Sequence, residues 1–275
     1  MKKFSQICVA LLLLMSCVMF SCTKSKSDPD PLPDKLVSIT GWMGGIQYDD
    51  HDRRSYIVGF TKDFYSTTYK YDAAGNVSTI SLFDGYGGSL VQWYDYKINY
   101  AGGLPVNGTR ANHAESGKSP ATTYSVDSIL YKTENGHVTE ITYLDRKAYF
   151  VSTNKPTGYV APGIIKTFLI SYANGNLTRM HSDYETFTYT YGVKKGAGSA
   201  NRMKFVLFEG ENALLYSMND MLTMYHEIHD QWGNSKNSSI YTHEYNTSGY
   251  PAVTTSTATL SNGQISTTNF TYKYE

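Results

Sequence analysis

The chain has 275 residues, with 24 basic and 24 acidic side chains and no net charge at pH 7. This balance supplies no basic field for nucleic acid, so a nucleic-acid partner is not expected. Tyrosine is frequent, at 25 residues, and the chain is rich in Thr and Ser. Such a composition suits β-sheets that have one buried and one solvated face.

The first residues carry an export signal. Two lysines precede an apolar run over residues 7–20, and Ser21 and Cys22 follow it. This is the order of a secretory signal peptide, and the run is shorter than the roughly 20 apolar residues that span a membrane. A Cys directly after a small residue is typical of a lipoprotein. We therefore predict a lipoprotein signal peptide over 1–21 and a lipid, such as palmitate, on Cys22; an ordinary secreted protein cut nearby is the alternative.

The segment around Cys22 also indicates where in the cell the protein is located. Residues 19–22 resemble the relaxed lipobox of lipoproteins from gut-type Gram-negative bacteria. The other two cysteines lie in the removed segment, which leaves the mature chain no Cys for a disulfide, a thiolate metal site or a nucleophile. Residues 22–35, rich in Lys, Ser, Asp and Pro, predict a flexible tether. Thr23, where an Asp would favour inner-membrane retention, favours the outer membrane, on its periplasmic or its surface face.

Residues 36–275 are predicted to form a single β domain. The segment 69–80 shows its construction, because it reads as a strand, a tight turn and a second strand. Asp72 and Gly75 take the first and fourth positions of a type I turn, where Asp accepts backbone N–H bonds and Gly adopts a positive φ.

Variants of this unit recur along the chain. Each has a glycine, any residue and then an apolar residue, beginning at Gly75, Gly103, Gly136, Gly175, Gly249 and Gly263. The steps between these glycines are 28, 33, 39, 74 and 14 residues. Irregular steps favour a meander of hairpins over a propeller of equal blades. We predict an all-β antiparallel β-meander, curled into a partial or closed barrel.

One segment departs from the β pattern. Its apolar residues fall at helical spacing, at Leu214, Met218, Met221, Leu222, Tyr225, Ile228 and Trp232. Such spacing places them on one face of an amphipathic helix. We therefore predict one covering α-helix near 211–230, lying over a sheet surface or a barrel mouth.

The hairpin units are similar to those of two known groups of bacterial proteins. They resemble the YD repeats of bacterial surface and toxin-shell proteins and, more closely, a group of envelope lipoproteins from gut-type Gram-negative bacteria. Features of that group occur here as Cys22, the Tyr/Gly hairpin units, a late helix at 214–229, a Tyr-x-x-Gly-Tyr-Pro-like unit at 245–251 and the final Tyr-x-Tyr-Glu at 272–275. The resemblance implies a porin-like barrel in a lipid-anchored protein, with no catalytic residues to carry over. The units lack the usual Arg after the Gly, which argues against a toxin shell.

No motif for catalysis, a cofactor or a metal is found. His226 and His229 are three apart, which is not the His-Glu-x-x-His spacing of zinc peptidases. The acidic run at 49–52 lacks the spacing of a calcium loop, and a solvated turn explains it. No Gly-x-Ser-x-Gly segment places a nucleophile. An enzyme is therefore not expected.

Aromatic side chains are the predicted ligand contacts, because their faces stack on sugars and other flat apolar surfaces. The candidates are Trp42, Tyr86, Trp93, Tyr94 and Trp232. The alternative is that these residues fill the core, or the rim between sheet and helix.

The predicted function is a non-catalytic binding or accessory module at the outer membrane, for a glycan, a peptide or a protein partner. A structural or assembly component of the envelope is the alternative, and an envelope hydrolase comes third. Function is expected where the repeat is broken, at 41–54, 82–94, 151–163 and the helix that ends at Trp232.

Overall fold

The structure is a computed structural model, and it describes the β domain. The residues described are 36–40, 43–48, 50, 54–59, 66–86, 89–113, 123–149, 156–200, 217–230 and 233–275. They all belong to one compact unit, Asp34–Glu275. The predicted signal peptide, Cys22 and the tether lie outside the described residues.

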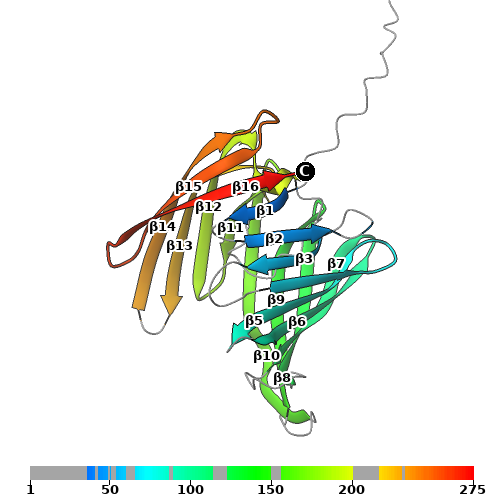
Figure 1. The fold of residues 1–275 in the computed structure, drawn as a ribbon. Helices are drawn as coiled ribbons and strands as arrows, with labels where there is room; N and C mark the ends of the chain where they lie inside the picture. The colour runs from blue at the N-terminus through cyan, green and yellow to red at the C-terminus, as the bar shows by residue number, and fades with distance from the viewer. Residues whose placement is uncertain are drawn as a thin grey trace, which may run out of the picture. The chain divides into compact units, whose positions relative to one another are not determined.

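Strands make up almost all of this unit (Figure 1). In chain order they are β1 Leu36–Thr40, β2 Met43–Tyr48, β3 Arg54–Gly59, β4 Ser66–Tyr71, β5 Val77–Tyr86, β6 Ser89–Ala101, β7 Leu104–His113, β8 Thr123–Glu134, β9 His137–Tyr149, β10 Pro156–Ala173, β11 Asn176–His181, β12 Glu185–Lys195, β13 Asn219–Asp230, β14 Gly233–Tyr245, β15 Pro251–Thr259 and β16 Ile265–Tyr274. One short 3₁₀ helix, η1 Ala197–Ala200, follows β12.

Each strand pairs antiparallel with its neighbours in the chain, so the sheet is a meander. The first strand, β1, pairs with the last, β16, over four register positions that begin at Leu36 and Tyr274. On its other side β1 meets β2 through one register pair, Ile39 with Met43. The order of paired strands is therefore cyclic. The predicted all-β antiparallel meander is confirmed.

The hairpin turns follow the predicted chemistry. Gly75 has a φ of 84° and donates its N–H to the Asp72 carbonyl at 3.0 Å, as the fourth residue of a type I turn does. The Asp72 carboxylate accepts the N–H groups of Ala74 and Asn76, both at 2.9 Å. All six glycines of the repeated unit have a positive φ. The return strand begins within two residues of each glycine, as the repeat predicts.

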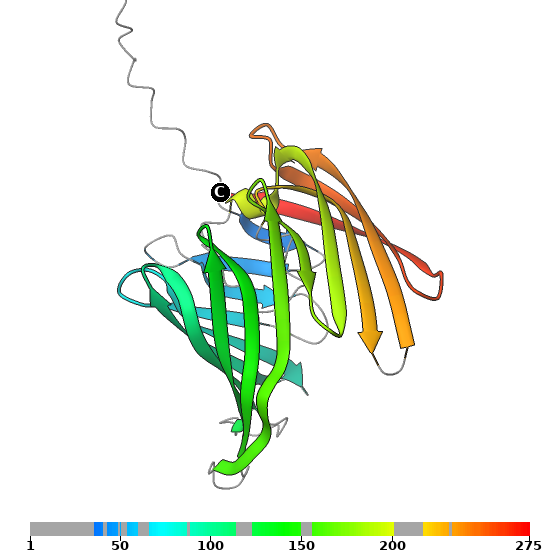
Figure 2. The ribbon, with the colours of Figure 1, turned by 180° about the vertical axis from the view of Figure 1, so that it is seen from behind.

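The repeat marks one end of the sheet. Successive turns of an antiparallel meander alternate between its two ends, so the strand order assigns each turn to an end. One end, called here the glycine-turn end, carries the turns at Gly75, Gly103, Gly136, Gly175 and Gly249. The turn at Gly263 lies at the opposite end. Figure 2 shows the hairpin turns of β8–β9 and β10–β11 at the same end of the sheet.

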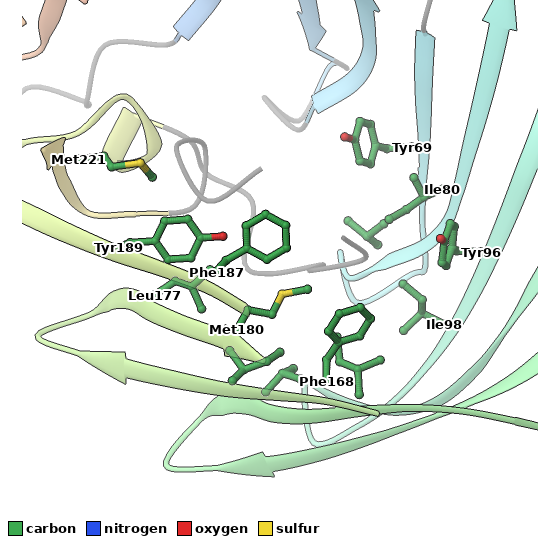
Figure 3. Close-up of a cluster of buried hydrophobic side chains, with 14 of the residues drawn as sticks. Tyr69, Ile80, Tyr96, Ile98, Phe168, Leu177, Met180, Phe187, Tyr189 and Met221 are labelled. Atoms are coloured by element: carbon green, nitrogen blue, oxygen red, sulfur yellow. The ribbon is translucent and has the colours of Figure 1, made fainter. Parts of the chain in front are cut away.

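Apolar side chains of alternate positions gather on the inward face of the sheet. Figure 3 shows how side chains from distant strands converge there, among them Tyr69, Ile80, Tyr96 and Ile98 from β4 to β6 and Phe168, Met180, Phe187 and Tyr189 from β10 to β12. Ile80 is fully buried, and Tyr96 and Met180 are 1 % exposed. Tyrosine thus serves mainly as a core residue, which is favourable because its large ring buries much apolar area.

The predicted covering helix near 211–230 is wrong for residues 219–230, which form strand β13. Residues 211–216 and Trp232 lie outside the described residues. Three members of the supposed apolar face are exposed, namely Met218, Leu222 and Tyr225. Continuous pairing with β12 and β14 satisfies the backbone of this segment, and that pairing overrides the helical spacing of the side chains.

Parts of the supposed breaks in the repeat are also strands. Residues 43–48 form β2, residues 82–86 continue β5, and β10 begins at Pro156. In β5, Leu82 pairs with Tyr94 on the inward face, and the ladder runs on to Tyr86 and Ser89. Ladder hydrogen bonds therefore outweigh the turn preference of the glycines there.

Candidate functional site

The structure places the predicted ligand contacts unevenly. Tyr94 is half-buried on the inward face of β6, 6.4 Å from the ring of Tyr96. Tyr86 and Trp93 belong to β5 and β6, but their side chains lie outside the described part of the chain. Trp42 and Trp232 lie outside it altogether. Tyr94 alone among these five can therefore be assigned a site.

Beside Tyr94 lies an ionic group that the sequence analysis missed, the Arg–Asp–Arg cluster of Arg110, Asp127 and Arg146. Arg110 donates from Nε and Nη2 to Asp127 Oδ2, at 3.1 and 2.6 Å. Arg146 donates from Nε to Oδ1 at 2.7 Å and from Nη2 to Oδ2 at 3.0 Å. The Asp127 side chain is only 3 % exposed. One buried carboxylate thus holds two guanidinium groups.

Aromatic rings support the cluster. The Arg110 guanidinium lies 4.4 Å from the centroid of the Tyr143 ring and 5.6 Å from that of Tyr94. Arginine stacks well on aromatic faces, and such contacts are stronger when they are shielded from water. The rings therefore fix the plane in which Arg110 presents its donors.

A bulge aims Arg146 at the cluster. On β9, residues 145 and 146 together oppose the single residue Asp127 of β8, because the register steps from Val126 with Lys147 to Ser128 with Leu144. Asp145 has a φ of 52°, a left-handed conformation that non-glycine residues seldom adopt, and its carboxylate accepts the Gly163 N–H at 3.0 Å. Bulges redirect side chains in this way.

The cluster sets the protonation of its members. Burial would raise the pKa of Asp127, but the hydrogen bonds from Arg146 and Arg110 outweigh burial and lower this pKa. Burial would lower the pKa of Arg110, but its contacts with Tyr96, Tyr143 and Asp127 raise this pKa. The hydrogen bond to Asp127 raises the pKa of Arg146. All three groups are therefore charged at neutral pH.

A second ionic group, the Lys–Glu–His cluster, lies further along the inward face. Glu185 accepts from Lys166 Nζ at 2.8 Å and lies 3.2 Å from His226 Nε2. Lys166 also lies 4.1 Å from the ring centroid of Phe168, and His226 stacks on Phe187 at 3.9 Å. Here one lysine balances one carboxylate.

Tyr143 joins the two clusters. Its ring lies against the Arg110 guanidinium and packs edge-on against Phe168, with ring centroids 6.3 Å apart. It is also the register partner of Lys166. The inward face is therefore divided: apolar side chains dominate toward the glycine-turn end, and charged or polar ones toward the opposite end.

The polar part of the inward face is open to solvent along β16. Ser266 and Thr268 share the phase of the inward residues Phe270 and Tyr272, and Thr268 pairs with the inward Ser256. Both Ser266 and Thr268 are nevertheless exposed. Small molecules can thus reach inward-facing side chains there.

Two other features do not form a reactive site. Ser81 and His113 both approach Asp95, but Asp95 lies between them, whereas a catalytic triad needs the His beside the Ser. The residues that the structure describes contain no group of three or more His, Cys, Asp or Glu side chains able to hold a metal ion.

A depression of about 360 Å³ lies at the glycine-turn end, between β10 and β13. Asn176 and Asn219 line it and satisfy each other, with hydrogen bonds of 2.8 and 2.9 Å. Among the described residues that line it, none is charged, so it offers less chemistry than the Arg–Asp–Arg cluster.

Known proteins give few parallels. No family model matches the sequence, and neither does any curated protein. One similar solved structure is described as a porin-like protein from Bacteroides uniformis; it is 14 % identical, has a TM-score of 0.38, and the match covers 89 % of this chain and 97 % of that one. Another, a porin-like protein from Bacteroides vulgatus, is 8 % identical with a TM-score of 0.47, covering 88 % and 99 %.

The lipid anchor and the kinship with YD repeats stay predictions. Among the residues that the structure describes, none form a helix long and apolar enough to cross a membrane.

Proposed function

We propose that this protein is a non-catalytic binding module of the cell envelope, which takes a soluble ligand onto the inward face of its sheet. The observation that supports this most is the Arg–Asp–Arg cluster with its tyrosine rings. Buried ion pairs add little net stability over apolar packing, so the stability of the fold does not require three charges inside the sheet. Convergent polar groups among aromatic side chains are typical of ligand sites.

The proposed attachment is the lipid on Cys22, at the outer membrane. Most outward positions of β15 and β16 are polar, among them Thr255, Thr257, Thr267, Asn269 and Lys273, although Val253 and Ile265 are apolar. Sheets that face lipid carry an apolar outer band instead. We therefore assign the membrane contact to the anchor and not to these strands, in a porin-like, partial or closed barrel.

The anchor is tested by Cys22→Ser. We expect the variant to leave the membrane fraction and appear in soluble fractions of the cell, because no lipid can be attached. A variant that stays wholly in the membrane fraction would contradict the anchor.

The binding role is tested by screening the full chain, in detergent, against neutral and charged glycans and peptides for a rise in melting temperature. Thr268→Trp would fill the inward face, whereas the matched Thr267→Trp points outward from the adjacent position. We expect the inward variant alone to weaken binding. If no compound binds, the structural role replaces the binding role; turnover of a bound compound would favour the hydrolase.

A further inference from the structure

The glycine-turn end of the sheet is also the end at which the tether enters the β domain. We propose that this end faces the membrane and that its β12 tip, defined as Val193, Lys194, Lys195 and Met218, docks on the lipid surface. The inference rests on the lipid anchor of the proposed function, and it concerns a surface separate from the inward ligand site.

The first strand places the anchor at this end. β16 runs from the turn at Gly263, at the opposite end, to the glycine-turn end, and Leu36 at the start of β1 pairs with Tyr274 at the finish of β16. The tether of residues 22–35 therefore joins the domain at the glycine-turn end. As a flexible coil its 14 residues span roughly 20 Å, whereas the 13 residues of β14 extend about 43 Å. The glycine-turn end is thus held nearest to a lipid on Cys22.

Ring contacts connect the start of β1 to the β12 tip. The ring centroid of Tyr274, the register partner of Leu36, lies 5.2 Å from that of Tyr250. Lys195 Nζ lies 4.5 Å from the same Tyr250 centroid and donates to the Ser248 carbonyl at 3.2 Å. Figure 1 shows the C-terminus beside β1. The β12 tip and the entry point of the tether therefore belong to one corner of the sheet.

Two apolar side chains of the β12 tip project into solvent. Val193 is 94 % exposed and Met218 is 53 % exposed. Gly196, directly after β12, donates its N–H to the Met218 carbonyl at 2.9 Å, which joins the two parts of the tip. Ile265, at the opposite end, is 70 % exposed, so the entry of the tether and not exposure alone selects the docking end. Apolar side chains held against a membrane can bury themselves between headgroups and acyl chains.

The two lysines add charge to the β12 tip. Lys194 Nζ lies 4.1 Å from the ring centroid of Tyr245, and Lys195 lies over Tyr250. Neither forms an ion pair with a carboxylate of the described residues. Asp220 is buried, and its carboxylate accepts the Lys194 N–H and the Tyr245 hydroxyl. Lysines beside a membrane are attracted to anionic lipid headgroups, which their long stems allow them to reach.

The test attaches a fluorophore at one position of the full, lipidated chain. The lipid blocks the Cys22 sulfur and the other two cysteines leave with the signal peptide, so Val193→Cys supplies the only free thiol. Ile265→Cys is the matched control, because Ile265 is an exposed apolar residue at the opposite end. The protein is placed in vesicles of phosphatidylethanolamine and phosphatidylglycerol that contain a nitroxide-labelled lipid as quencher. We expect the quencher to remove most of the fluorescence at position 193 and little of it at position 265.

Lys194→Gln and Lys195→Gln test the charges in the protein labelled at position 193. Each should lower the ratio of docked to undocked protein, read from the quenched fraction, by about fivefold. Added salt should lower it as well. Lys97→Gln, which alters an exposed lysine within β6, should leave it unchanged. Melting temperatures check that the variants are folded, and unchanged quenching in both lysine variants would overturn the headgroup contact.

The vesicles also separate the docking from the anchor. If the protein stays with the vesicles but positions 193 and 265 are quenched equally, or neither is quenched, the docking is overturned and the anchor stands. If the protein does not stay with the vesicles, the anchor and the docking fall together.

Discussion

The hydroxyl of Tyr100 donates a hydrogen bond to the backbone carbonyl of Val77, at 2.8 Å. Val77 is the apolar residue two positions after the turn glycine Gly75, and Tyr100 comes from the next strand. The same relationship recurs in two further hairpins, Tyr191 with Leu177 at 2.5 Å and Tyr274 with Pro251 at 2.9 Å. In each of these three cases a tyrosine thus ties a hairpin to the strand that follows it.

Tyr100→Phe removes this hydrogen bond and keeps the ring. We expect it to lower the free energy of unfolding by about 1 kcal/mol, because the Val77 carbonyl loses a partner in partly buried surroundings. Combining it with Tyr191→Phe and Tyr274→Phe should cost about 3 kcal/mol, since distant sites add. Denaturant unfolding measures both.

The matched control is Tyr225→Phe, which alters a tyrosine that is 49 % exposed. We expect this variant to unfold like the parent protein. An effect of Tyr100→Phe no larger than that of Tyr225→Phe would show that the tie adds no stability.

Substitutions at two glycines distinguish the cost of a steric clash with the neighbouring strand from the cost of an unfavourable backbone φ. A Cβ at Gly108 would lie 2.3 Å from the Lys97 carbonyl oxygen, a backbone atom that cannot turn aside. Gly102 has a φ of 59° and open space around it. We expect Gly108→Ala to cost about 3 kcal/mol through overpacking and Gly102→Ala about 1 kcal/mol through its positive φ. Equal losses of unfolding free energy in the two variants would contradict the close approach.

The sequence predicted the hairpins well because turn chemistry is local. Gly75 and its relatives need a positive φ wherever the chain folds, so the glycine pattern located the turns at all six of these glycines. The irregular steps between the glycines now have a cause. Steps of 28, 33 and 39 residues span two strands, the step of 74 spans four, and the step of 14 spans one.

The helix prediction failed because spacing alone cannot tell which face is buried. Met221 is inward and buried, but Leu222 and Tyr225 are outward and exposed. Apolar residues at exposed strand positions can by chance produce the spacing of a helix. Here the pairing with β12 and β14 makes the segment a strand.

The candidate site was partly visible in the sequence. Asp127 has the phase of Ile129 and Tyr131 along β8, so a charged residue inside the sheet could have been noticed there. Arg146 could not, because its phase from the inward Tyr143 points outward. The bulge at Asp145 reverses that phase, and bulges leave no clear signal in one sequence.

Asp127→Asn tests the cluster through stability. We expect the change to cost about 3–5 kcal/mol at pH 7, because two guanidinium groups lose the charge of the carboxylate that they share. The pKa of Asp127 is lower in the folded protein than its unfolded value of 3.8. The unfolded state therefore binds the extra proton first as the pH falls, so the Asp127 contribution is present above about pH 4 and is lost below it.

Urea unfolding from pH 7 down to pH 3 measures this contribution. The gap between the parent protein and Asp127→Asn should narrow below about pH 4, whereas Asp183→Asn, at an exposed turn, should follow the parent throughout. A gap that stays constant with pH would mean that the carboxylate charge is not what stabilises the cluster.

Tyr272 makes the protein sensitive to alkali. Burial of its side chain, which is 6 % exposed, raises its pKa from 10.0 to about 12. Between these values the unfolded tyrosine loses its proton and the folded one keeps it, so stability falls as the pH rises. We expect the loss between pH 8 and pH 11 to be about 1.4 kcal/mol smaller in Tyr272→Phe than in the parent protein. Tyr225→Phe should lose as much unfolding free energy over this range as the parent protein. An equal loss in Tyr272→Phe would show that folding does not raise the pKa of Tyr272.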